Sequence, residues 1–538
     1  QELKDFISLA KLNTQDEEIV LDLIEKFKDA ELYGSLIKDF KYTPEQYDIV
    51  LKEVQNVDDN QFQISNILAV QNIKPILTNL LRQAIYLSSK YDIVATNPPY
   101  LPTLSNEKLS TFARNFYPNS KADLFSMFME VLLVKQNGFL AMINMHSWMF
   151  LQSYERFRQI VINKNFVSML HLGARAFEDI GGEVVQTTSF IMRESIIDDY
   201  NTKFYRLIEY RSQQEKEMAF LNKRNVYQNN IRKFRLINGY PFAYWLSNAI
   251  YNLFQNTDAL IGDKIECATG LSTSDNNRFL RLWFEVEYSK TNFSSQDNSK
   301  KWISMAKGGA FRRWYGNKEY VINWENDGFE IKDYAKFLYG CSSRTIKNVK
   351  NYFNNGLTWS ALSNKLSVRI MDNSIFGSGA NCAFTNNDKY YLGLFNSPII
   401  SYLVNALNPT LNMNVSEMLK IPYVGGESFN IDNLVVGLIK TSQIDYDQYE
   451  TSWDFKKNPL LPTDFGINAN WNIASQYVSY KNIVNQRFDT LKQNEEELNR
   501  IFIDIYGLQD ELTPDVEVKD VTVARIYDKK EDIQESMK

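Results

Sequence analysis

The stretch Tyr91–Tyr100, YDIVATNPPY, decides the expected fold. Its first six residues form a short apolar run typical of a buried strand, and the two prolines force a rigid loop immediately after it. Further apolar runs of helix and strand length follow: a helix at 121–136, a strand at 139–145, a helix at 150–163, and strands at 166–173 and 187–192. This order is typical of a parallel α/β sheet. The sequence therefore predicts an α/β fold, with the NPPY loop at the carboxyl end of a strand.

The residue types of the NPPY loop suit chemistry on an amino group attached to an aromatic ring. Such a nitrogen is a poor nucleophile, because its lone pair is delocalised into the ring. Two hydrogen-bond acceptors would favour a pyramidal nitrogen, and the Asn97 amide oxygen and the Pro98 carbonyl are candidates; Pro99 stiffens the loop. Tyr100 offers a flat surface for a base removed from the stack. The alternative is a proline turn that ends a core strand, with Tyr100 as a packing residue.

Composition excludes several classes of protein. The 538 residues suggest three or four domains, and no apolar run is long enough to span a bilayer. The chain has three widely spaced cysteines and two histidines, too few for a disulfide framework or for most metal sites. We therefore expect no membrane partner, no structural metal and a reducing, cytoplasmic location, with His146 and His171 as satisfied interior side chains.

The organisation along the chain predicts five regions. Residues 1–90 show helical spacing of apolar positions, and from about Gly262 short irregular segments rich in Tyr, Trp, Asn, Gly and Ser replace the α/β pattern. The expected regions are a helical segment at 1–90, an α/β region at 91–200, a helical connector at 201–261, a mixed α+β region at 262–425 and a helical C-terminal region at 426–538.

Basic residues are concentrated in the irregular region that begins near Gly262. Between Lys264 and Ile370 there are 17 Lys and Arg against 10 Asp and Glu, a local net charge of +7 in a chain of net charge −6. Cations neutralise phosphates, arginine can read guanine, and glycines let a backbone approach closely. The candidate DNA-binding residues are Thr273 and Arg278 in ATGLSTSDNNRF, and Lys307, Arg312 and Arg313 in WISMAKGGAFRRWYGN. The alternative is a solvated basic turn.

Several longer segments carry a resemblance to a known family. They include NFYPNSKADLFSMFMEVLLVKQNGFLAMINMHSWMFLQSYERFR, HLGARAFEDIGGEVVQTTSF, KGGAFRRWYGNKEYVINWENDG and LNRIFIDIYGLQDELTPDV. Together with NPPY they resemble PglX, the family of adenine-specific DNA methyltransferases of BREX phage-defence systems, from about residue 90 to 520. The resemblance implies methylation of adenine N6 with S-adenosylmethionine to mark host DNA. It also implies double-stranded DNA as a partner, with other BREX proteins as further candidates. On this resemblance residues 91–200 would be the second half of a methyltransferase domain, and residues 262–425 would be a DNA target-recognition domain.

The resemblance also implies roles for individual residues. Asn97, Pro98, Pro99 and Tyr100 would form the catalytic loop, with Asn97 also near the cofactor methyl group. Phe177, in HLGARAF, would close on the other face of the flipped adenine. Phe128 is similar to an aromatic residue that contacts the adenine ring of the cofactor. For Phe177 and Phe128 the alternative is an ordinary core phenylalanine.

One expected motif is missing from the sequence. The family has a glycine-rich cofactor loop before NPPY, whereas Gly34 is the only glycine before Asn97 and lies in a segment of helical pattern. We therefore expect the C-terminal portion of a longer protein, which contains the second half of a Rossmann-like methyltransferase sheet. The leading hypothesis is an adenine-N6 DNA methyltransferase for the complete protein. The rival is a DNA-recognition fragment without catalysis.

Overall fold

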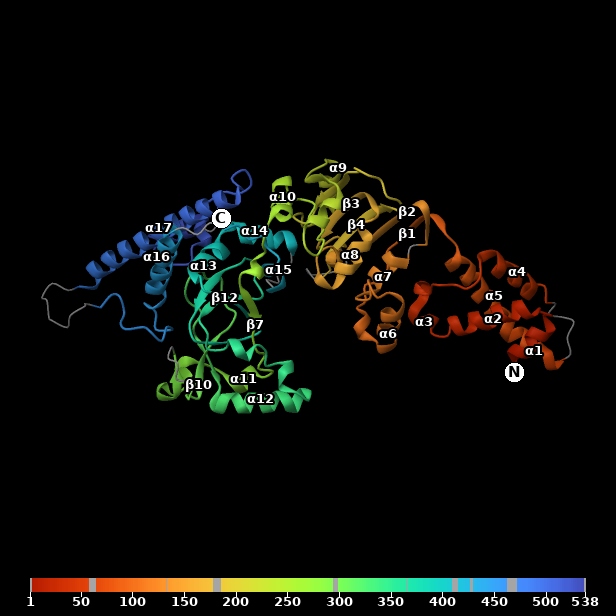
Figure 1. The fold of residues 1–538 in the computed structure, drawn as a ribbon, viewed down its shortest axis with the longest axis horizontal. Helices are drawn as coiled ribbons and strands as arrows, with labels where there is room; N and C mark the ends of the chain where they lie inside the picture. Colours follow the sequence, from red (N-terminus) through yellow and green to blue (C-terminus); the bar gives the residue numbers. More distant parts are fainter. Residues whose placement is uncertain are drawn as a thin grey trace. The chain divides into compact units, whose positions relative to one another are not determined.

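A computed structural model describes residues 2–57, 64–131, 133–177, 185–293, 299–363, 365–408, 415–425, 429–461 and 472–536. The chain divides into two compact units, residues 1–245 and 246–538 (Figure 1). Each unit is described separately below. Among the residues described, no helix combines the length and the apolar character needed to cross a membrane.

The first unit begins with a helical region, as expected for residues 1–90. Its helices are α1 (Glu2–Leu9), α2 (Thr14–Lys26), α3 (Ala30–Tyr33), α4 (Pro44–Gln55) and α5 (Ile64–Ser88). Local sequence sets the helix starts: Asn13 caps α2, and Thr43 with Gln46 forms a capping box on α4. The helices share an apolar core that includes Phe6, Leu23 and Leu81.

A six-stranded sheet follows, and it confirms the predicted α/β class. The strands are β1 (Tyr91–Thr96), β2 (Val134–Met145), β3 (Asn165–Gly173), β4 (Thr187–Arg193), β5 (Thr202–Arg206) and β6 (Val226–Asn229), in the order β1-β2-β4-β3-β5-β6. The β1–β2 and β3–β5 pairs are parallel, but β4 runs antiparallel to both of its neighbours. The sheet is therefore mixed rather than parallel throughout.

Two boundaries within this unit differ from the sequence-based expectation. The helix expected at 121–136 is shorter, α7 (Leu124–Val131), because β2 already begins at Val134. A short apolar run suits either a helix or a strand. The region 201–261, expected to be a helical connector, instead supplies β5 and β6 to the sheet before α10 (Asn248–Asn256). The sheet therefore continues well beyond residue 200.

The two faces of the sheet differ in exposure. On one face Leu140, Met142 and Met192 are buried, and Trp148 covers Phe166 and Phe190 with ring centroids about 6.1 Å away. On the other face three paired strands expose apolar side chains: Ile93 is 68% exposed, Ile191 40% and Phe139 36%. Ile93 lies beside Phe139 in the register of β1 and β2. β1 is also an edge strand, because within the described residues it pairs only with β2.

The second unit combines two small sheets with several helices. One sheet has the order β14-β10-β11-β8, with β9 (Thr291–Asn292) beside β10, and the other has the order β13-β12-β15-β7. Their strands are β7 (Glu266–Thr269), β8 (Leu280–Leu282), β10 (Trp302–Ala306), β11 (Tyr320–Asn323), β12 (Gly356–Ser360), β13 (Val368–Met371), β14 (Ile375–Phe376) and β15 (Ala380–Phe384). The main helices are α12 (Glu325–Tyr339), α13 (Asp388–Asn396), α14 (Pro398–Leu407), α16 (Phe429–Tyr446) and α17 (Ile473–Tyr506). Helices α16 and α17 pack against α13 and α14, so the expected recognition and C-terminal regions share one compact unit.

Candidate active site

The NPPY loop follows the carboxyl end of β1, as the sequence predicts. Asn97 is exposed and Pro98 is buried. The Tyr100 hydroxyl lies 3.0 Å from Asn97 Oδ1, to which it donates, and 3.3 Å from the Ile143 carbonyl of β2. Burial raises the pKa of Tyr100 to about 12, so this hydroxyl stays protonated and remains a donor near neutral pH. The Asn97 amide oxygen is thereby oriented, and its second lone pair can accept another hydrogen bond.

Asp123 anchors the other end of the loop, and the sequence analysis did not single it out. Its Oδ1 accepts hydrogen bonds from the backbone nitrogens of Leu101, at 3.0 Å, and Phe125, at 3.3 Å. The residue is 9% exposed, and burial raises the pKa of its carboxyl group. The available signal was an acidic residue directly before the apolar helix α7, where carboxylates cap free N–H groups. Asp123 therefore joins the residue after Tyr100 to the start of α7.

Three phenylalanines, Phe125, Phe128 and Phe177, lie in the segments that the sequence places near the site. Phe125 contacts Tyr100, edge to face at 6.2 Å between ring centroids. Phe128 is half-buried and packs against the core cluster that contains Leu109 and Met127. Phe177 is half-buried just beyond β3, a strand separated from β1 by β2 and β4. Their proposed contacts with cofactor and base remain predictions.

The two histidines form a hydrogen-bonded chain with Tyr244. His146 directly follows β2, and His171 lies near the end of β3. His146 Nδ1 lies 2.8 Å from His171 Nε2, and His171 Nδ1 lies 3.0 Å from the Tyr244 hydroxyl. Burial lowers the pKa of His146 to about 4 and holds the pKa of His171 well below its usual value. Both rings are therefore neutral near pH 7 and act as hydrogen-bonded interior groups. Within the described residues, no group of three or more His, Cys, Asp and Glu residues could hold a metal ion.

Two candidate DNA-binding residues lie in the loop between β7 and β8. The Thr273 hydroxyl is buried and bonds to Asn276 Oδ1 at 2.6 Å. Arg278 forms an ion pair with Glu330 of α12 at 2.8 Å and lies over the Tyr334 ring. Both side chains therefore have partners inside the unit.

Three further candidates lie in the loop between β10 and β11. Lys307 lies over the Tyr320 ring at 4.2 Å, and Arg312 lies over the Tyr446 ring at 5.2 Å. Arg313 is 14% exposed at its side chain and forms an ion pair with Glu495 of α17. Lys307 and Arg312 form no direct ion pair in the described chain, although Arg312 interacts electrostatically with the buried Asp445 carboxyl group, whereas Arg313 is paired with Glu495.

The glycines of this loop serve internal packing. A Cβ at Gly308 would lie 2.4 Å from the Gly379 carbonyl oxygen, and the backbone of Gly309 exchanges hydrogen bonds with the Ser360 hydroxyl. Both glycines therefore allow a close approach to the neighbouring chain segments at Gly379 and Ser360.

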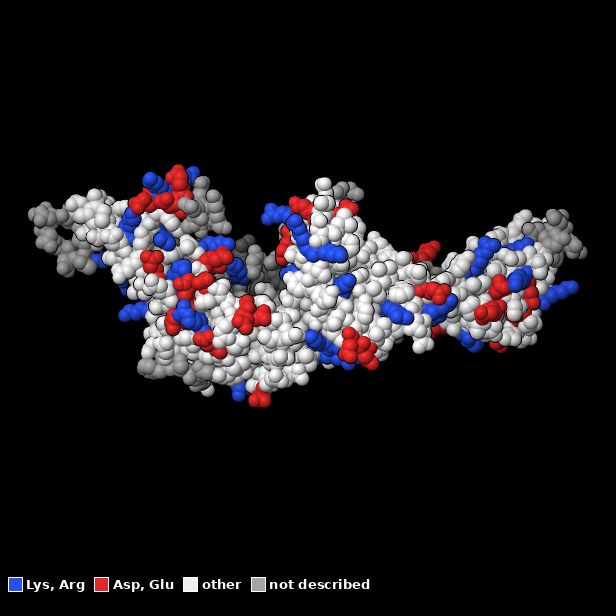
Figure 2. All heavy atoms as spheres, turned by 90° about the horizontal axis from the view of Figure 1, so that it is seen from above, with Lys and Arg blue, Asp and Glu red and all other residues white. Residues whose placement is uncertain are grey.

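Many lysines and arginines of the basic region form ion pairs. Eight of the cations between Lys264 and Ile370 pair with carboxylates: Lys290, Lys301, Lys318, Lys332, Lys350, Lys365, Arg278 and Arg313. On the face shown in Figure 2, basic and acidic side chains are interspersed, and no large area of one sign is visible. The count of charges in the sequence therefore overstates the free basic surface.

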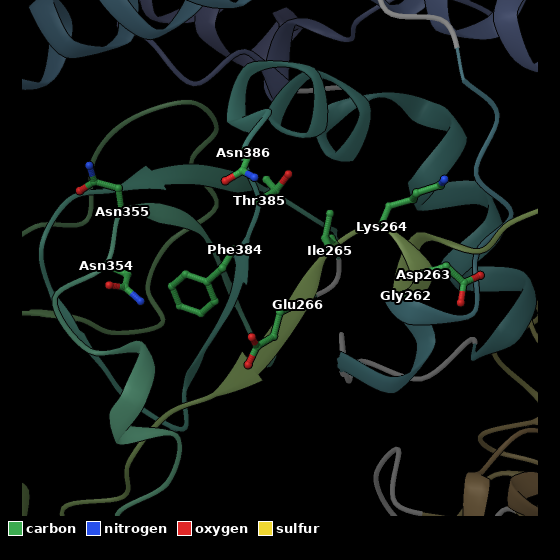
Figure 3. A pocket seen from close by; sticks show the side chains of 10 residues that line it. All are labelled: Gly262, Asp263, Lys264, Ile265, Glu266, Asn354, Asn355, Phe384, Thr385 and Asn386. Atoms are coloured by element: carbon green, nitrogen blue, oxygen red, sulfur yellow. The ribbon is translucent and has the colours of Figure 1, made fainter.

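A polar hollow of about 570 Å³ lies beside β7 and β15 in the second unit (Figure 3). Asp263, Glu266, Asn355 and Asn386 contribute polar groups, with the Phe384 ring nearby. All of its lining residues come from the second unit, so it contains none of the NPPY loop.

The fold and the loop define a class of protein, and comparison with known proteins agrees. The family model of the Eco57I restriction-modification methylase matches residues 6–177. The solved structure of the Type IIL restriction-modification enzyme MmeI in complex with DNA covers 92% of this chain and 75% of its own, with a TM-score of 0.52 and 11% sequence identity. At that identity the likeness shows the fold alone, which is that of a restriction-modification enzyme.

Closer sequence relatives are adenine-specific methyltransferases. The chain is 37% identical over 544 aligned residues to the adenine-specific methyltransferase PglX of Lacticaseibacillus casei (strain Zhang). It is 34% identical over 534 to the adenine-specific methyltransferase BrxX of Escherichia coli O9:H4 (strain HS). Each match covers 97% of this chain, and the resemblance to the PglX family is thereby confirmed. The chain spans 45% and 42% of the lengths of these two relatives.

Proposed function

We propose that this chain is part of a DNA methyltransferase that transfers a methyl group from S-adenosylmethionine to adenine N6 and marks host DNA in BREX-type phage defence. The observation that carries the proposal is the geometry of the NPPY loop. The exposed Asn97 amide oxygen is oriented by the Tyr100 hydroxyl at the end of β1, in a chain similar throughout to adenine-specific methyltransferases.

In the proposed reaction this chain acts on the target base. Asn97 Oδ1 and the Pro98 carbonyl accept hydrogen bonds from the two N–H groups of the adenine amino group and so hold its lone pair out of conjugation with the ring. S-adenosylmethionine, when bound, would supply the methyl group and leave as S-adenosylhomocysteine, and the amino group would release one proton. Tyr100 stacks on one face of the flipped base, and Phe177 closes on the other. Acceptors placed for the transition state should contribute more to turnover than to DNA binding.

The described residues make only part of a cofactor site. The single glycine before Asn97, Gly34, lies between α3 and a short 3-10 helix rather than in a loop after a strand. Phe128 packs into a core cluster. We therefore assign to this chain the chemistry at the target base.

The free edge of β1 offers a place for the rest of the site. The unpaired N–H and C=O groups of an edge strand can accept another strand, and exposed Ile93 and Phe139 can pack against whatever covers that face. We propose that additional strands of the longer protein extend the sheet there and bring the glycine-rich loop.

For the second unit we propose recognition of double-stranded DNA within residues 262–425. Lys307 and Arg312 remain the best of the candidates named from the sequence, because they form no direct ion pair in the described chain. Thr273, Arg278 and Arg313 hold the loops in place through internal contacts. Other BREX proteins as partners and a cytoplasmic location are part of the same proposal.

The test is Asn97→Ala in the longer protein, with exposed Asn201→Ala as the matched control. Loss of one positioned hydrogen-bonding group of this kind typically costs about 100-fold or more in turnover. We expect Asn97→Ala to lose methyl transfer by at least this factor in a radiolabel assay, and to change the dissociation constant for DNA by less than about twofold. Weaker DNA binding with normal turnover of bound DNA would contradict the assigned role.

A second candidate function is DNA recognition without catalysis. The absence of a glycine-rich turn before Asn97 favours it for residues 1–538 alone. Under this alternative, the chain binds duplex DNA but methylates it neither alone nor together with the remainder of the longer protein. Methylation restored by adding that remainder would exclude it.

A further inference from the structure

His146 occupies the part of the sheet edge between the two residues that are proposed to hold the target base. The strand order β1-β2-β4-β3 puts β2 and β4 between β1, which leads to Tyr100, and β3, which leads to Phe177. His146 directly follows β2, and its backbone nitrogen donates to the carbonyl of Gln186, just before β4, at 2.9 Å. An adenine held between Tyr100 and Phe177 would therefore lie over the end of β2.

Backbone contacts place these segments at the same edge of the sheet. The strands β1 and β2 are parallel, and the Tyr100 hydroxyl donates to the Ile143 carbonyl at 3.3 Å, three residues before His146. The first residue of β4 pairs with Met145 of β2 on one side and with Gly173 of β3 on the other. The NPPY loop, His146 and the segment after β3 therefore all follow strand ends at one edge, where α/β sheets bind their ligands.

The hydrogen-bonded chain determines which ring nitrogen of His146 carries the hydrogen. Tyr244 is 1% exposed, and the partner of its hydroxyl among the described residues is His171 Nδ1, at 3.0 Å. Tyr244 therefore donates to His171 Nδ1, since a buried hydroxyl without an acceptor is costly. Both histidines are neutral near pH 7, so each ring has one N–H. His171 then donates from Nε2 to His146 Nδ1, at 2.8 Å, and the hydrogen of His146 lies on Nε2.

This N–H of His146 is the open end of the chain. Both ring nitrogens of His171 are bonded, whereas His146 Nε2 forms no hydrogen bond within the described ranges, and the His146 side chain is partly exposed. The lone pair of His146 is on Nδ1 and is occupied by His171. His146 Nε2 is therefore an uncharged hydrogen-bond donor and not a proton acceptor.

We propose that His146 Nε2 donates a hydrogen bond to a ring nitrogen of the extruded adenine, N1 or N7, the two acceptors that flank the amino group. Asn97 and Pro98 would accept from the amino group itself, so His146 supplies the complementary donor. His171 and Tyr244 are positioning residues, because they hold the hydrogen on Nε2. The inference rests on the proposed function and adds to it a residue that selects the base. A site built around such a donor rejects a base that lacks the acceptor, since the donor is then left unpaired.

The test measures single-turnover methylation by the longer protein on duplexes whose target adenine is replaced by 1-deazaadenine or 7-deazaadenine. Each analogue has a C–H group in place of one ring nitrogen. One of them should slow the wild type roughly 5- to 100-fold more than it slows His146→Ala, in which the bond is already absent. The chemical effect of the analogue on the amino group is common to both proteins and cancels in this comparison. The other analogue should slow both proteins equally.

His146→Gln can place an amide N–H near the position of Nε2 and should restore part of the difference between wild type and His146→Ala. Tyr244→Phe should reduce that difference, because the hydrogen of His146 is no longer fixed on Nε2. Met218→Ala, at an exposed position of the same unit, is the control and should leave every rate unchanged.

Equal losses with each analogue in wild type and His146→Ala would overturn the inference and leave the proposed function intact, since His146 would then only pack. Melting temperatures of the first unit identify a variant that fails to fold. In that case the comparison of wild type with His146→Gln decides, and equal losses in these two proteins without any slowing of the wild type by either analogue would overturn the inference. Absence of methyl transfer to unmodified DNA by the wild-type longer protein would overturn the proposed function and the inference with it.

Discussion

Glu495 should hold the second unit together from its interior. This carboxylate of α17 is 1% exposed, and its Oε1 accepts a hydrogen bond from Trp314 Nε1 at 2.6 Å. Its Oε2 lies 3.3 Å from Arg313 Nη1. Burial raises the pKa of Glu495, whereas Arg313 and Trp314 act in the opposite direction. The loop between β10 and β11, which contains the predicted DNA contacts, is thus held against helix α17.

The Glu495→Ala substitution leaves a buried guanidinium and an indole N–H without their acceptor. Removing one partner of a buried ion pair costs about 3–5 kcal/mol. For a unit of this size, one kcal/mol changes the melting temperature by about 2–4 °C, so the expected decrease is roughly 6–20 °C. Glu495→Gln keeps an oxygen for Trp314 and should have a smaller effect. Replacement of both charges, in Arg313→Met/Glu495→Met, should recover most of the loss.

Scanning calorimetry of the chain should show this decrease in the transition of residues 246–538 and not in that of residues 1–245. Glu497→Ala is the matched control, because Glu497 lies on the same helix but forms an exposed pair with Arg500, which contributes little. If Glu495→Ala melted within about 2 °C of Glu497→Ala, the structural role assigned to the buried pair would be refuted.

Three further predictions concern the first unit. Residues 1–538 alone should show no S-adenosylmethionine binding by calorimetry at cofactor concentrations that saturate the longer protein, and saturable micromolar binding would disprove the missing-loop interpretation. Burial lowers the pKa of His146 to about 4 in the folded chain. The neutral side chain therefore makes its full contribution to the free energy of unfolding of the first unit above about pH 6.5. That contribution is lost as the pH falls towards 4; the melting temperature of the first unit should decrease over this window, and less so in His146→Gln. Asp123→Ala should lower turnover of the longer protein about tenfold with DNA affinity unchanged, whereas Asp123→Asn, which keeps the Oδ1 acceptor, should retain activity; equal loss in both would contradict the positioning role.

The sequence was most informative at the NPPY loop, where the residues that suit the proposed chemistry also determine the local structure. YDIVATNPPY predicted both a strand and the loop that follows it. A short apolar run and a double proline are each compatible with only a few backbone conformations. The antiparallel direction of β4 was not predicted, since apolar runs indicate strands but not the direction in which they pair. The strands β5 and β6 were missed for the related reason that short, half-polar strands have weak periodicity.

The candidate DNA contacts show the limits of counting charges. Sequence patterns selected Arg278 and Arg313 as candidates, but their partners Glu330 and Glu495 are 52 and 182 residues away in the sequence. Such tertiary pairs decide whether a cation is free, and they are invisible to local composition. Phe337 of α12 is 83% exposed, and this exposure is similarly undetectable from spacing alone, because a helical phenylalanine is usually buried.

The unpaired edge of β1 has a practical consequence for anyone who prepares this chain. An edge strand that pairs on one side only within the described residues, and that contains an isoleucine 68% exposed, is a template for edge-to-edge association between copies. Isolated residues 1–538 should therefore aggregate in a concentration-dependent way through the first unit. A charged side chain in place of Ile93 should improve solubility, and co-expression with the remainder of the longer protein should do so without any substitution.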